Sequence, residues 1–464
     1  MTQPSPDATM RTVVLASLGG ALEFYDFVAY GIFAEYIAPA FFPAQDELAS
    51  LVSTFTVFAG GYLIRPLGGV VFSHFGDRFG RRATFLTSLL GISLATFGMA
   101  VCPTHQAWGG WATVAFVVLR LLQGFCLGGE LPGAVTYVVE AAAPGRTGLA
   151  CGLLFSCASL GVVLASSVSA GLHALLPTPA MAAYGWRLAF GLGGALGILS
   201  YLPRRQLLES PVFALMRERQ EVERSPLALV LRRNLGRVAV GFGTTAVVAA
   251  FNGILFAYLP AYLVRVALYP AATVATAVTV GLVANAVAVL AAGAMCDLVP
   301  ARTVHRLGAA AVLLASWPFF RAVADHGTAN LAWTLAGFGA LGGVASGAFA
   351  VVLAGLFPAR VRFTGVALAF NASFAVFSGL APLAAASLVA ATGNAAAPGC
   401  YLAAVAVVSL IASLGSIEDG GAKGSRTPDR LNAIQAPGPG VDTEWLTGRE
   451  GETGGPNGPG PRPG

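Results

Sequence analysis

Charged side chains are rare inside the long apolar stretches of this sequence, and four of them could do chemistry together. Glu23 and Asp26 stand three residues apart in ALEFYDFVAYG, so a helix would present both on roughly one face. Arg65 and Arg120 stand inside two later apolar stretches. An acid pair can neutralise an arginine, and protonation of the acid would release the arginine for an anion. These residues outline a proton-coupled anion site; the alternative is a static ion pair that only fixes helix packing.

The composition indicates what must position these charges. The chain is 56% hydrophobic and 11% charged, whereas an ordinary soluble domain is about 25% charged. Apolar runs of about 20 residues, the length that crosses a bilayer, recur along most of the chain. We therefore predict an all-α membrane protein with twelve transmembrane helices near residues 11–37, 50–72, 83–102, 111–139, 149–176, 185–203, 237–263, 271–296, 304–324, 329–357, 362–391 and 396–415.

A polar gap divides the predicted spans into two groups of six. We expect an N-terminal six-helix half at 1–203, a cytoplasmic central loop at 204–236, a C-terminal six-helix half at 237–417 and a disordered cytoplasmic tail at 418–464. Phe213 interleaves with charge in the central loop, which favours either an amphipathic helix or a solvated linker. The tail holds the one lysine, Lys423, and is either a flexible terminus or an aberrant extension.

The two halves repeat a pattern. Asp77 and Arg82 follow the second predicted span, and Asp297 and Arg302 follow the eighth at the same spacing. This echo indicates duplication of a six-helix unit, which is a common plan among secondary transporters.

Arginines concentrate on one side of the predicted membrane. With the N-terminus placed in the cytoplasm, the inside loops hold most of them and the outside loops hold only Arg187, Arg265 and Arg321. This asymmetry satisfies the positive-inside rule. We therefore predict a multi-pass protein of the plasma (inner) membrane with both termini in the cytoplasm.

Several function classes are excluded. The basic residues behind the net charge of +5 lie in short loops rather than on one soluble face, so we expect no nucleic-acid partner. The five histidines are scattered at span ends without a nucleophile or ligand set. With Lys423 in the tail, no Gly-Lys-Ser/Thr phosphate loop exists. We expect no enzyme activity, no catalytic residue, no metal and no cofactor.

Three segments carry a resemblance to a known family. They are LEFYDFVAYG at 22–31, RPLGGVVFSHFGDRFGRR at 65–82 and RLLQGFCLGGE at 120–130. These segments resemble the metabolite:proton symporter family of the major facilitator superfamily, and with the span count the likeness covers residues 11 to about 415. The resemblance implies the major facilitator fold and places Glu23, Asp26 and Arg120 on cavity-lining helices.

The turn after the second predicted span is the most specific part of this resemblance. The family pattern implies that it latches a cytoplasmic gate, with Asp77 facing a helix N-terminus of the other half. We add the repeated pair after the eighth span to these candidates. We also add Glu130, an acid near the inner end of the fourth span, for which the alternative is a solvated charge without a gating role. Our gating candidates are Asp77, Gly80, Arg81, Arg82, Glu130, Asp297 and Arg302.

The predicted function is proton-coupled symport of a small metabolite by alternating access, carried out by a monomer in the lipid bilayer. Glu23 or Asp26 would take the proton. Guanidinium groups suit planar carboxylates, which favours a di- or tricarboxylate. The alternatives are a zwitterionic osmolyte, export of amphiphilic compounds, and a receptor or channel that transports nothing. The substrate-binding candidates are Arg65, Arg120, Tyr30, Asn252 and Tyr258.

Overall fold

The chain folds into long helices in the computed structural model. The structure describes residues 6–43, 47–327 and 329–415, apart from the side chains of residues 6–12, 19, 23, 27, 47, 48, 51, 52 and 55. No strand occurs among these residues, so the predicted all-α class is confirmed. The predicted tail at 418–464 lies outside them.

The first half contains α1 to α10. Its elements are α1 (Pro6–Ile32), α2 (Ala34–Phe41), α3 (Glu47–Leu63), α4 (Arg65–Phe79), α5 (Arg81–Val101), α6 (His105–Trp108), α7 (Gly110–Ala141), α8 (Thr147–Leu175), α9 (Thr178–Ala180), η1 (Met181–Gly185) and α10 (Trp186–Arg204). The second predicted span is a nearly continuous pair, α3 and α4. The first ends earlier than predicted, because α1 breaks before α2.

The central loop and the second half complete the fold. Their elements are α11 (Pro211–Glu218), α12 (Pro226–Arg233), α13 (Leu235–Asn252), η2 (Gly253–Tyr258), α14 (Leu259–Arg265), α15 (Ala271–Met295), α16 (Ala301–Ala324), α17 (Leu331–Gly355), η3 (Ala359–Val361), α18 (Arg362–Ser373), η4 (Phe374–Ser378), α19 (Ala381–Thr392) and α20 (Pro398–Leu414). The segments η2 and η4 are π-helical turns inside longer helices, a distortion that is frequent at functional sites.

The number of membrane-crossing helices agrees with the prediction. Ten helical stretches within the described part of the chain are long and apolar enough to cross a bilayer. The 19-residue α10 and the 17-residue α20 occupy the places of the sixth and twelfth spans. The prediction of twelve transmembrane helices in two six-helix halves is confirmed.

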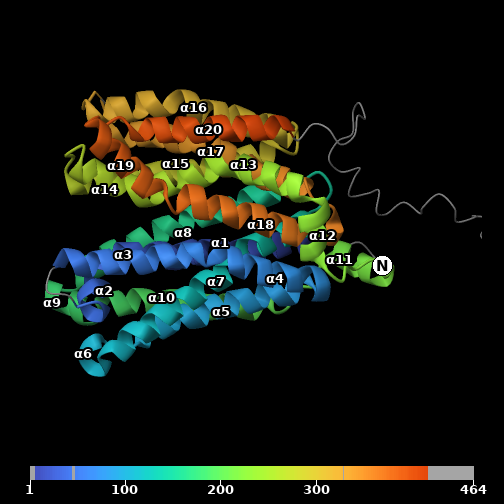
Figure 1. Cartoon of the computed structure of the whole chain (residues 1–464), viewed down its shortest axis with the longest axis horizontal. Helices are drawn as coiled ribbons and strands as arrows, with labels where there is room; N and C mark the ends of the chain where they lie inside the picture. The colour runs from blue at the N-terminus through green and yellow to red at the C-terminus, as the bar shows by residue number, and fades with distance from the viewer. Residues whose placement is uncertain (1–5, 44–46, 328, 416–464) are drawn as a thin grey trace, which may run out of the picture. The chain divides into compact units, whose positions relative to one another are not determined.

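The helices of each half run side by side, α1 to α10 in blue to green and α13 to α20 in yellow-green to orange (Figure 1). The helix pairs that pack most extensively between the halves are α8 with α15 and α4 with α18. The beginning of α1, the end of α20 and both helices of the central loop lie at one end of the bundle, which we call the α11 end.

The central loop is helical, as one of the two alternatives predicted. Ser210 caps α11 by accepting a hydrogen bond from the amide of Phe213 at 3.0 Å. Phe213 and Met216 of α11 are each 2% exposed, so their side chains pack against the protein. The loop is therefore a docked part of the fold, and the alternative of a solvated linker is wrong.

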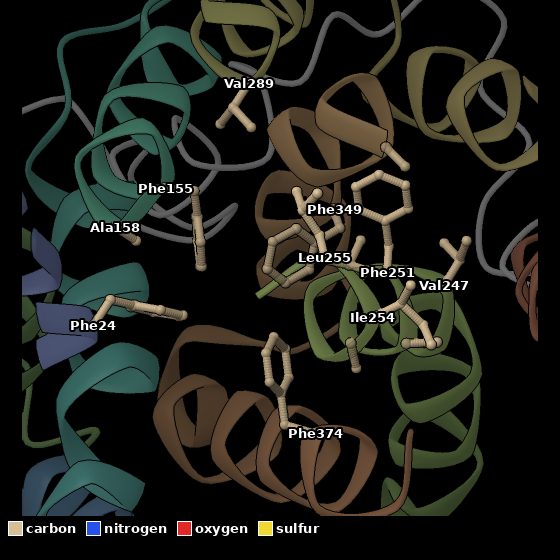
Figure 2. Close-up of a cluster of buried hydrophobic side chains, with 14 of the residues drawn as sticks. Phe24, Phe155, Ala158, Val247, Phe251, Ile254, Leu255, Val289, Phe349 and Phe374 are labelled. Carbon is tan, nitrogen blue, oxygen red and sulfur yellow. The ribbon is translucent and has the colours of Figure 1, made fainter. Parts of the chain in front are cut away.

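Aromatic rings fill the middle of the junction between the halves. Figure 2 shows Phe24 of α1 and Phe155 of α8 pointing toward Phe349 of α17 and Phe374 of η4. All four are buried, and the rings of Phe155 and Phe349 meet edge to face with centroids 4.7 Å apart. Dispersion between rings thus holds the two halves together at this level.

Candidate functional site

Asp26 lies inside the first half, where helices from three other spans surround it. Its side chain is buried, and Oδ2 accepts a hydrogen bond from Oγ1 of Thr96 in α5 at 2.9 Å. Within the described part of the chain, Oδ1 has no hydrogen-bond partner. Gly193 of α10 makes room for this oxygen, because a Cβ atom there would overlap it. The fold therefore keeps one carboxylate oxygen of Asp26 open.

A chain of hydrogen bonds leads from Asp26 to Arg120. Oγ1 of Thr96 accepts a hydrogen bond from Nε2 of Gln123 at 2.7 Å, and Oε1 of Gln123 accepts one from Nη1 of Arg120. Arginine only donates, which assigns the oxygen of the Gln123 amide to the arginine side. We call Arg120, Gln123, Thr96 and Asp26 the Asp26 chain. It spans α7, α5 and α1.

Aromatic rings flank both predicted arginines. The guanidinium carbon of Arg120 lies 4.2 Å from the ring centre of Tyr30 and 5.2 Å from that of Phe58. The Tyr30 hydroxyl donates to the carbonyl of Thr54 at 3.1 Å, which fixes the ring. Arg65 is buried and lies 5.6 Å from the ring centre of its neighbour Tyr62. Cation–π attraction thus helps to hold both charges in the apolar interior.

The other predicted binding residues have different surroundings. The side chain of Glu23 lies outside the described residues. Asn252 and Tyr258 are buried in α13 and η2 of the second half, where the ring of Tyr258 packs 5.5 Å from that of Tyr262. Asn252 and Tyr258 are therefore not members of the Asp26 chain. No three His, Cys, Asp or Glu side chains in the described part of the chain are grouped as a metal site requires.

Two of the predicted gating residues, Asp77 and Arg81, lie in a buried charge cluster at the α11 end. Oδ2 of Asp77 accepts two hydrogen bonds from Thr364 in the first turn of α18, one from the amide and one from the hydroxyl, each at 2.8 Å. Arg81 contacts Asp77 at 3.3 Å and Glu140 at 2.7 Å. Glu140 also pairs with Arg362 at 2.9 Å. We call these five residues the α11-end cluster. The implied contact of Asp77 with a helix N-terminus of the other half is confirmed.

Asp297 makes the equivalent contact on the opposite side of the junction. Its carboxylate accepts hydrogen bonds from the amides of Gly148 at 2.6 Å and Leu149 at 2.9 Å, at the N-terminus of α8. Burial raises the pKa of Asp297, although these amides and Arg146 oppose the rise. The two predicted repeats thus cap helices of each other's halves. Arg302 is exposed in the first turn of α16.

Gly80 and Arg82 connect the signature turn to the central loop. Gly80 has φ +128°, a conformation that favours glycine, and a side chain there would meet the carboxylate of Glu209. Oε1 of Glu209 accepts hydrogen bonds from the amides of Arg81 and Arg82, both at 3.1 Å. The guanidinium of Arg82 donates to the carbonyl of Arg205. The start of α5 is therefore capped by the central loop.

Glu130 lies deep inside the first half. It accepts a hydrogen bond from Ser88 at 2.9 Å and pairs with Arg204 at 3.6 Å. Arg204 in turn donates to the carbonyls of Leu15 at 2.6 Å and Ala16 at 3.1 Å. Glu130 thus ties α7 to α5, α10 and α1, and it does not belong to the α11-end cluster.

Two asparagines make hydrogen bonds between the halves. Nδ2 of Asn371 in α18 donates to the carbonyl of Gly128 in α7 at 2.8 Å. Oδ1 of Asn285 in α15 accepts from the hydroxyl of Ser159 in α8 at 2.9 Å. These bonds are of the helix-to-helix kind that polar side chains commonly make in membranes.

Sequence reasoning missed several members of both groups. By its place near the inner end of the fourth predicted span, Glu140 could be a gating or a solvated charge, and Arg362 is visible as a charge near a span end. Their pairing depends on helices from opposite halves. Thr96, Gln123 and Thr364 are neutral residues in apolar stretches, and nothing in the sequence distinguishes them from their neighbours. Only the packing of α5 against α7 and of α4 against α18 reveals their partners.

Comparisons with solved structures identify the fold as that of a major facilitator transporter. A double-tryptophan mutant of XylE superposes with a TM-score of 0.77 over 92% of this chain and 99% of that chain, at 16% identity. The major facilitator proton:xylose symporter XylE bound to 6-bromo-6-deoxy-D-glucose gives 0.73 over 93% of this chain and all of that one, again at 16% identity.

Sequence comparisons define the family. The model of the family "Sugar (and other) transporter" matches residues 12–234. A citrate-proton symporter of Salmonella typhi is 31% identical, with 87% of this chain and 93% of the relative covered. A putative proline/betaine transporter of Staphylococcus haemolyticus (strain JCSC1435) is also 31% identical, with 86% of each covered. The chain belongs to the metabolite:proton symporter family of the major facilitator superfamily, and it is a multi-pass membrane protein.

Proposed function

We propose that this protein is a proton-driven symporter of a small organic anion, such as a di- or tricarboxylate, that works by alternating access. The observation that carries the proposal is the Asp26 chain, in which hydrogen bonds connect a buried carboxylate to a buried guanidinium. A buried charge in a membrane span is costly and is a functional candidate by default. Its connection to a group that can bind carboxylates suggests coupling rather than packing alone.

In this proposal, each end of the Asp26 chain has one function: one end binds the proton and the other binds the substrate. Asp26, assisted by Glu23, binds the proton, and Oδ1 of Asp26 is the oxygen open to receive it. Arg120 and Arg65 bind carboxylate groups of the substrate, since guanidinium matches their planar geometry. Protonation of Asp26 cancels the negative charge that attracts Arg120. The arginine then interacts more strongly with a substrate anion. Tyr30 positions Arg120, and Asn252 and Tyr258 offer polar contacts from the other half.

The α11-end cluster and the Asp297 cap serve as the gate on one side. Opening that side would break the bonds from Thr364 to Asp77 and from Gly148 to Asp297, which join opposite halves. Gly80 and Arg82 hold the signature turn against the central loop, and Arg302 takes the matching position in the second half. Glu130 supports this gate from inside the first half.

The α11 end is assigned to the cytoplasm. This assignment rests on the arginines concentrated in the loops at that end and on the positive-inside rule. Both termini would then be cytoplasmic, and the protein would work as a monomer in the plasma (inner) membrane.

A zwitterionic osmolyte is the second candidate substrate. Phe24, Phe155, Phe349 and Phe374 gather where the halves meet (Figure 2), and aromatic faces attract quaternary ammonium groups. A molecule with one carboxylate and one such cation could use both the rings and Arg120. Relatives named as proline/betaine transporters favour the same candidate.

The test is uptake into proteoliposomes with Asp26→Asn beside the wild type. We expect the wild type to accumulate one of labelled citrate, succinate, 2-oxoglutarate, proline or betaine when the outside is acidic. A gradient of about one pH unit supports about tenfold accumulation in one-proton symport, because one pH unit is a factor of ten in proton activity. Asp26→Asn should remove this accumulation and retain solute exchange at equal pH.

Three outcomes decide between the candidates. Accumulation of a carboxylate supports the anion, and accumulation of proline or betaine supports the zwitterion. If no solute enters but a preloaded lipophilic cation leaves as protons enter, export replaces symport. Full accumulation by Asp26→Asn would remove Asp26 from the coupling mechanism.

Gly193→Ala offers an independent way to perturb Asp26. The new Cβ would overlap Oδ1 of Asp26 and lie 2.8 Å from the Tyr25 ring, so the carboxylate must move. We expect loss of gradient-driven accumulation in the same uptake assay, by about tenfold at about one pH unit. Gly191→Ala on the same helix is the control, because its Cβ would meet only Ala100 at 3.9 Å. Equal accumulation by the two variants would contradict the prediction.

A further inference from the structure

Thr96 occupies an unusual position between three hydrogen-bonding groups. Its Oγ1 lies 2.9 Å from Oδ2 of Asp26 and also 2.9 Å from the carbonyl oxygen of Ile92, while Nε2 of Gln123 donates to it at 2.7 Å. A hydroxyl has one hydrogen, so it donates to Asp26 or to Ile92 at any moment. The choice depends on whether Asp26 itself accepts or donates.

The bonds of the Asp26 chain all point the same way when Asp26 is ionised. Arg120 donates to Gln123, Gln123 donates to Thr96, and Thr96 donates to the carboxylate. Aligned hydrogen bonds polarise one another, and a charged group at each end strengthens them. The Asp26 chain therefore transmits the attraction between Asp26 and Arg120 through the two neutral side chains of Gln123 and Thr96.

Protonation of Asp26 reverses the last bond. A proton taken up on Oδ1 comes to face Thr96 when the carboxyl group turns over about its two-fold χ2 torsion. Asp26 then donates to Oγ1 of Thr96, and the Thr96 hydrogen turns to the carbonyl of Ile92. Oγ1 still accepts from Gln123, so Thr96 keeps hydrogen bonds to both of its neighbours in the Asp26 chain. The alignment toward Asp26 is lost, however, and with it part of the restraint on Arg120.

We propose that Thr96 and Gln123 are positioning residues that couple the protonation state of Asp26 to the position of the Arg120 guanidinium. This inference rests on the proposed symport and deepens it, since it names the path between the proton site and the anion site. Arg120 from α7 and Tyr25 beside Asp26 are the titratable or charged groups that face the carboxylate among the described side chains. The groups facing it from α5 and α10 are Thr96 and Gly193, and neither titrates.

Thr96→Val removes the hydroxyl and keeps the shape of the side chain. Its matched control is Thr136→Val, because Thr136 is also a buried helical threonine and its hydroxyl bonds only the carbonyl of Pro132, at 2.8 Å. The variants are reconstituted with whichever of labelled citrate, succinate, 2-oxoglutarate, proline or betaine the wild type accumulates. Gradient-driven accumulation, exchange at equal pH and the pH profile of uptake are measured for each.

We expect Thr96→Val to lose accumulation, falling about tenfold below the wild type under a gradient of about one pH unit, and to exchange solute within about twofold of the wild type. Its pH profile should change, and Thr96→Ser should restore both readouts. Thr136→Val should match the wild type. Gln123→Met, which removes both amide bonds, should behave as Thr96→Val does and covers the case in which that variant fails to fold.

A double variant separates coupling from packing. If Thr96 acts through Asp26, adding Thr96→Val to Asp26→Asn leaves accumulation and exchange at the levels of Asp26→Asn alone. Normal accumulation by Thr96→Val, or equal loss of accumulation and exchange, overturns the inference while the symport stands. Failure of the wild type to accumulate any solute overturns the proposed function, and the inference with it.

Discussion

Glu140→Ala is expected to open the α11 end of the protein. The substitution leaves Arg81 and Arg362 buried without the carboxylate that bonds them at 2.7 Å and 2.9 Å. Removing one partner of a buried ion pair costs about 3–5 kcal/mol, because the remaining charge is uncompensated. That cost falls on the closed arrangement, so the equilibrium should move toward the open one by about a hundredfold or more.

The native Cys151 can report this opening. It is buried in α8 close to the junction with α15, and an alkylating reagent reaches it only when the helices separate. In a background where Cys151 is the one cysteine, we expect Glu140→Ala to speed alkylation by N-ethylmaleimide by about a hundredfold. Adding Arg362→Met to Glu140→Ala should recover part of the protection, since it removes the guanidinium that had paired with Glu140, whereas Arg81 keeps its contact with Asp77.

An exposed ion pair provides the control for Glu140→Ala. Asp325 pairs with Arg321 at 2.8 Å, but the two side chains are 59% and 64% exposed. Such pairs contribute about 1 kcal/mol or less, so Asp325→Ala should leave the alkylation rate of Cys151 unchanged. An unchanged rate in Glu140→Ala as well would show that the α11-end cluster does not keep this side closed.

The sequence predicted the spans well because a bilayer imposes one simple requirement. Each crossing helix needs a long apolar run, and such runs can be counted without knowing their neighbours. The repeat was equally informative. Asp77 and Asp297 were matched by their spacing alone, and in the structure each caps a helix of the opposite half. Because the contact was duplicated together with the six-helix unit, its sequence motif occurs twice and can be recognised without the structure.

The hydrogen bonds and ion pairs inside the site could not be predicted in the same way. Glu130 was grouped with the gate because it lies toward the inner end of the fourth predicted span, yet Arg204 and Ser88 hold it inside the first half. Asp26 and Arg120 were expected to meet, and the structure adds Gln123 and Thr96 between them. The identity of such partners depends on the rotation of each helix about its axis, which tertiary packing sets.

The packing around Asp26 also bears on the alternative that Asp26 and Arg120 form a static ion pair. A pair that only fixed the helices would be served best by direct contact and by a carboxylate with both oxygens bonded. Asp26 instead keeps Oδ1 without a partner among the described residues, and Gly193 preserves the space beside it. An oxygen left unbonded in the interior costs stability, so its presence calls for an explanation such as a functional role. This arrangement favours coupling over packing.

Gly68→Ala is expected to be among the most destabilising single-methyl changes in the protein. A Cβ atom at Gly68 of α4 would overlap the carbonyl oxygen of Phe125 in α7, and one at Gly128 of α7 would overlap the carbonyl oxygen of Arg65. Both obstacles are backbone atoms, so no side chain can turn aside. Overpacking of this kind costs about 3 kcal/mol. The purified variant should unfold in detergent at a clearly lower Tm.

The effect of Gly68→Ala should reach the site as well as the fold. The helices α4 and α7 carry Arg65, Asp77, Arg120 and Glu140, so separating them shifts both arginines of the proposed anion site and both acids of the α11-end cluster. Gly337→Ala is the control, since an added Cβ there meets nothing within 4 Å and alanine favours a helix by about 1 kcal/mol. It should leave the Tm equal or higher. If Gly68→Ala kept the wild-type Tm, α4 and α7 would have to cross less closely than they do here, and the proposal that Arg65 and Arg120 form one anion site would lose its support.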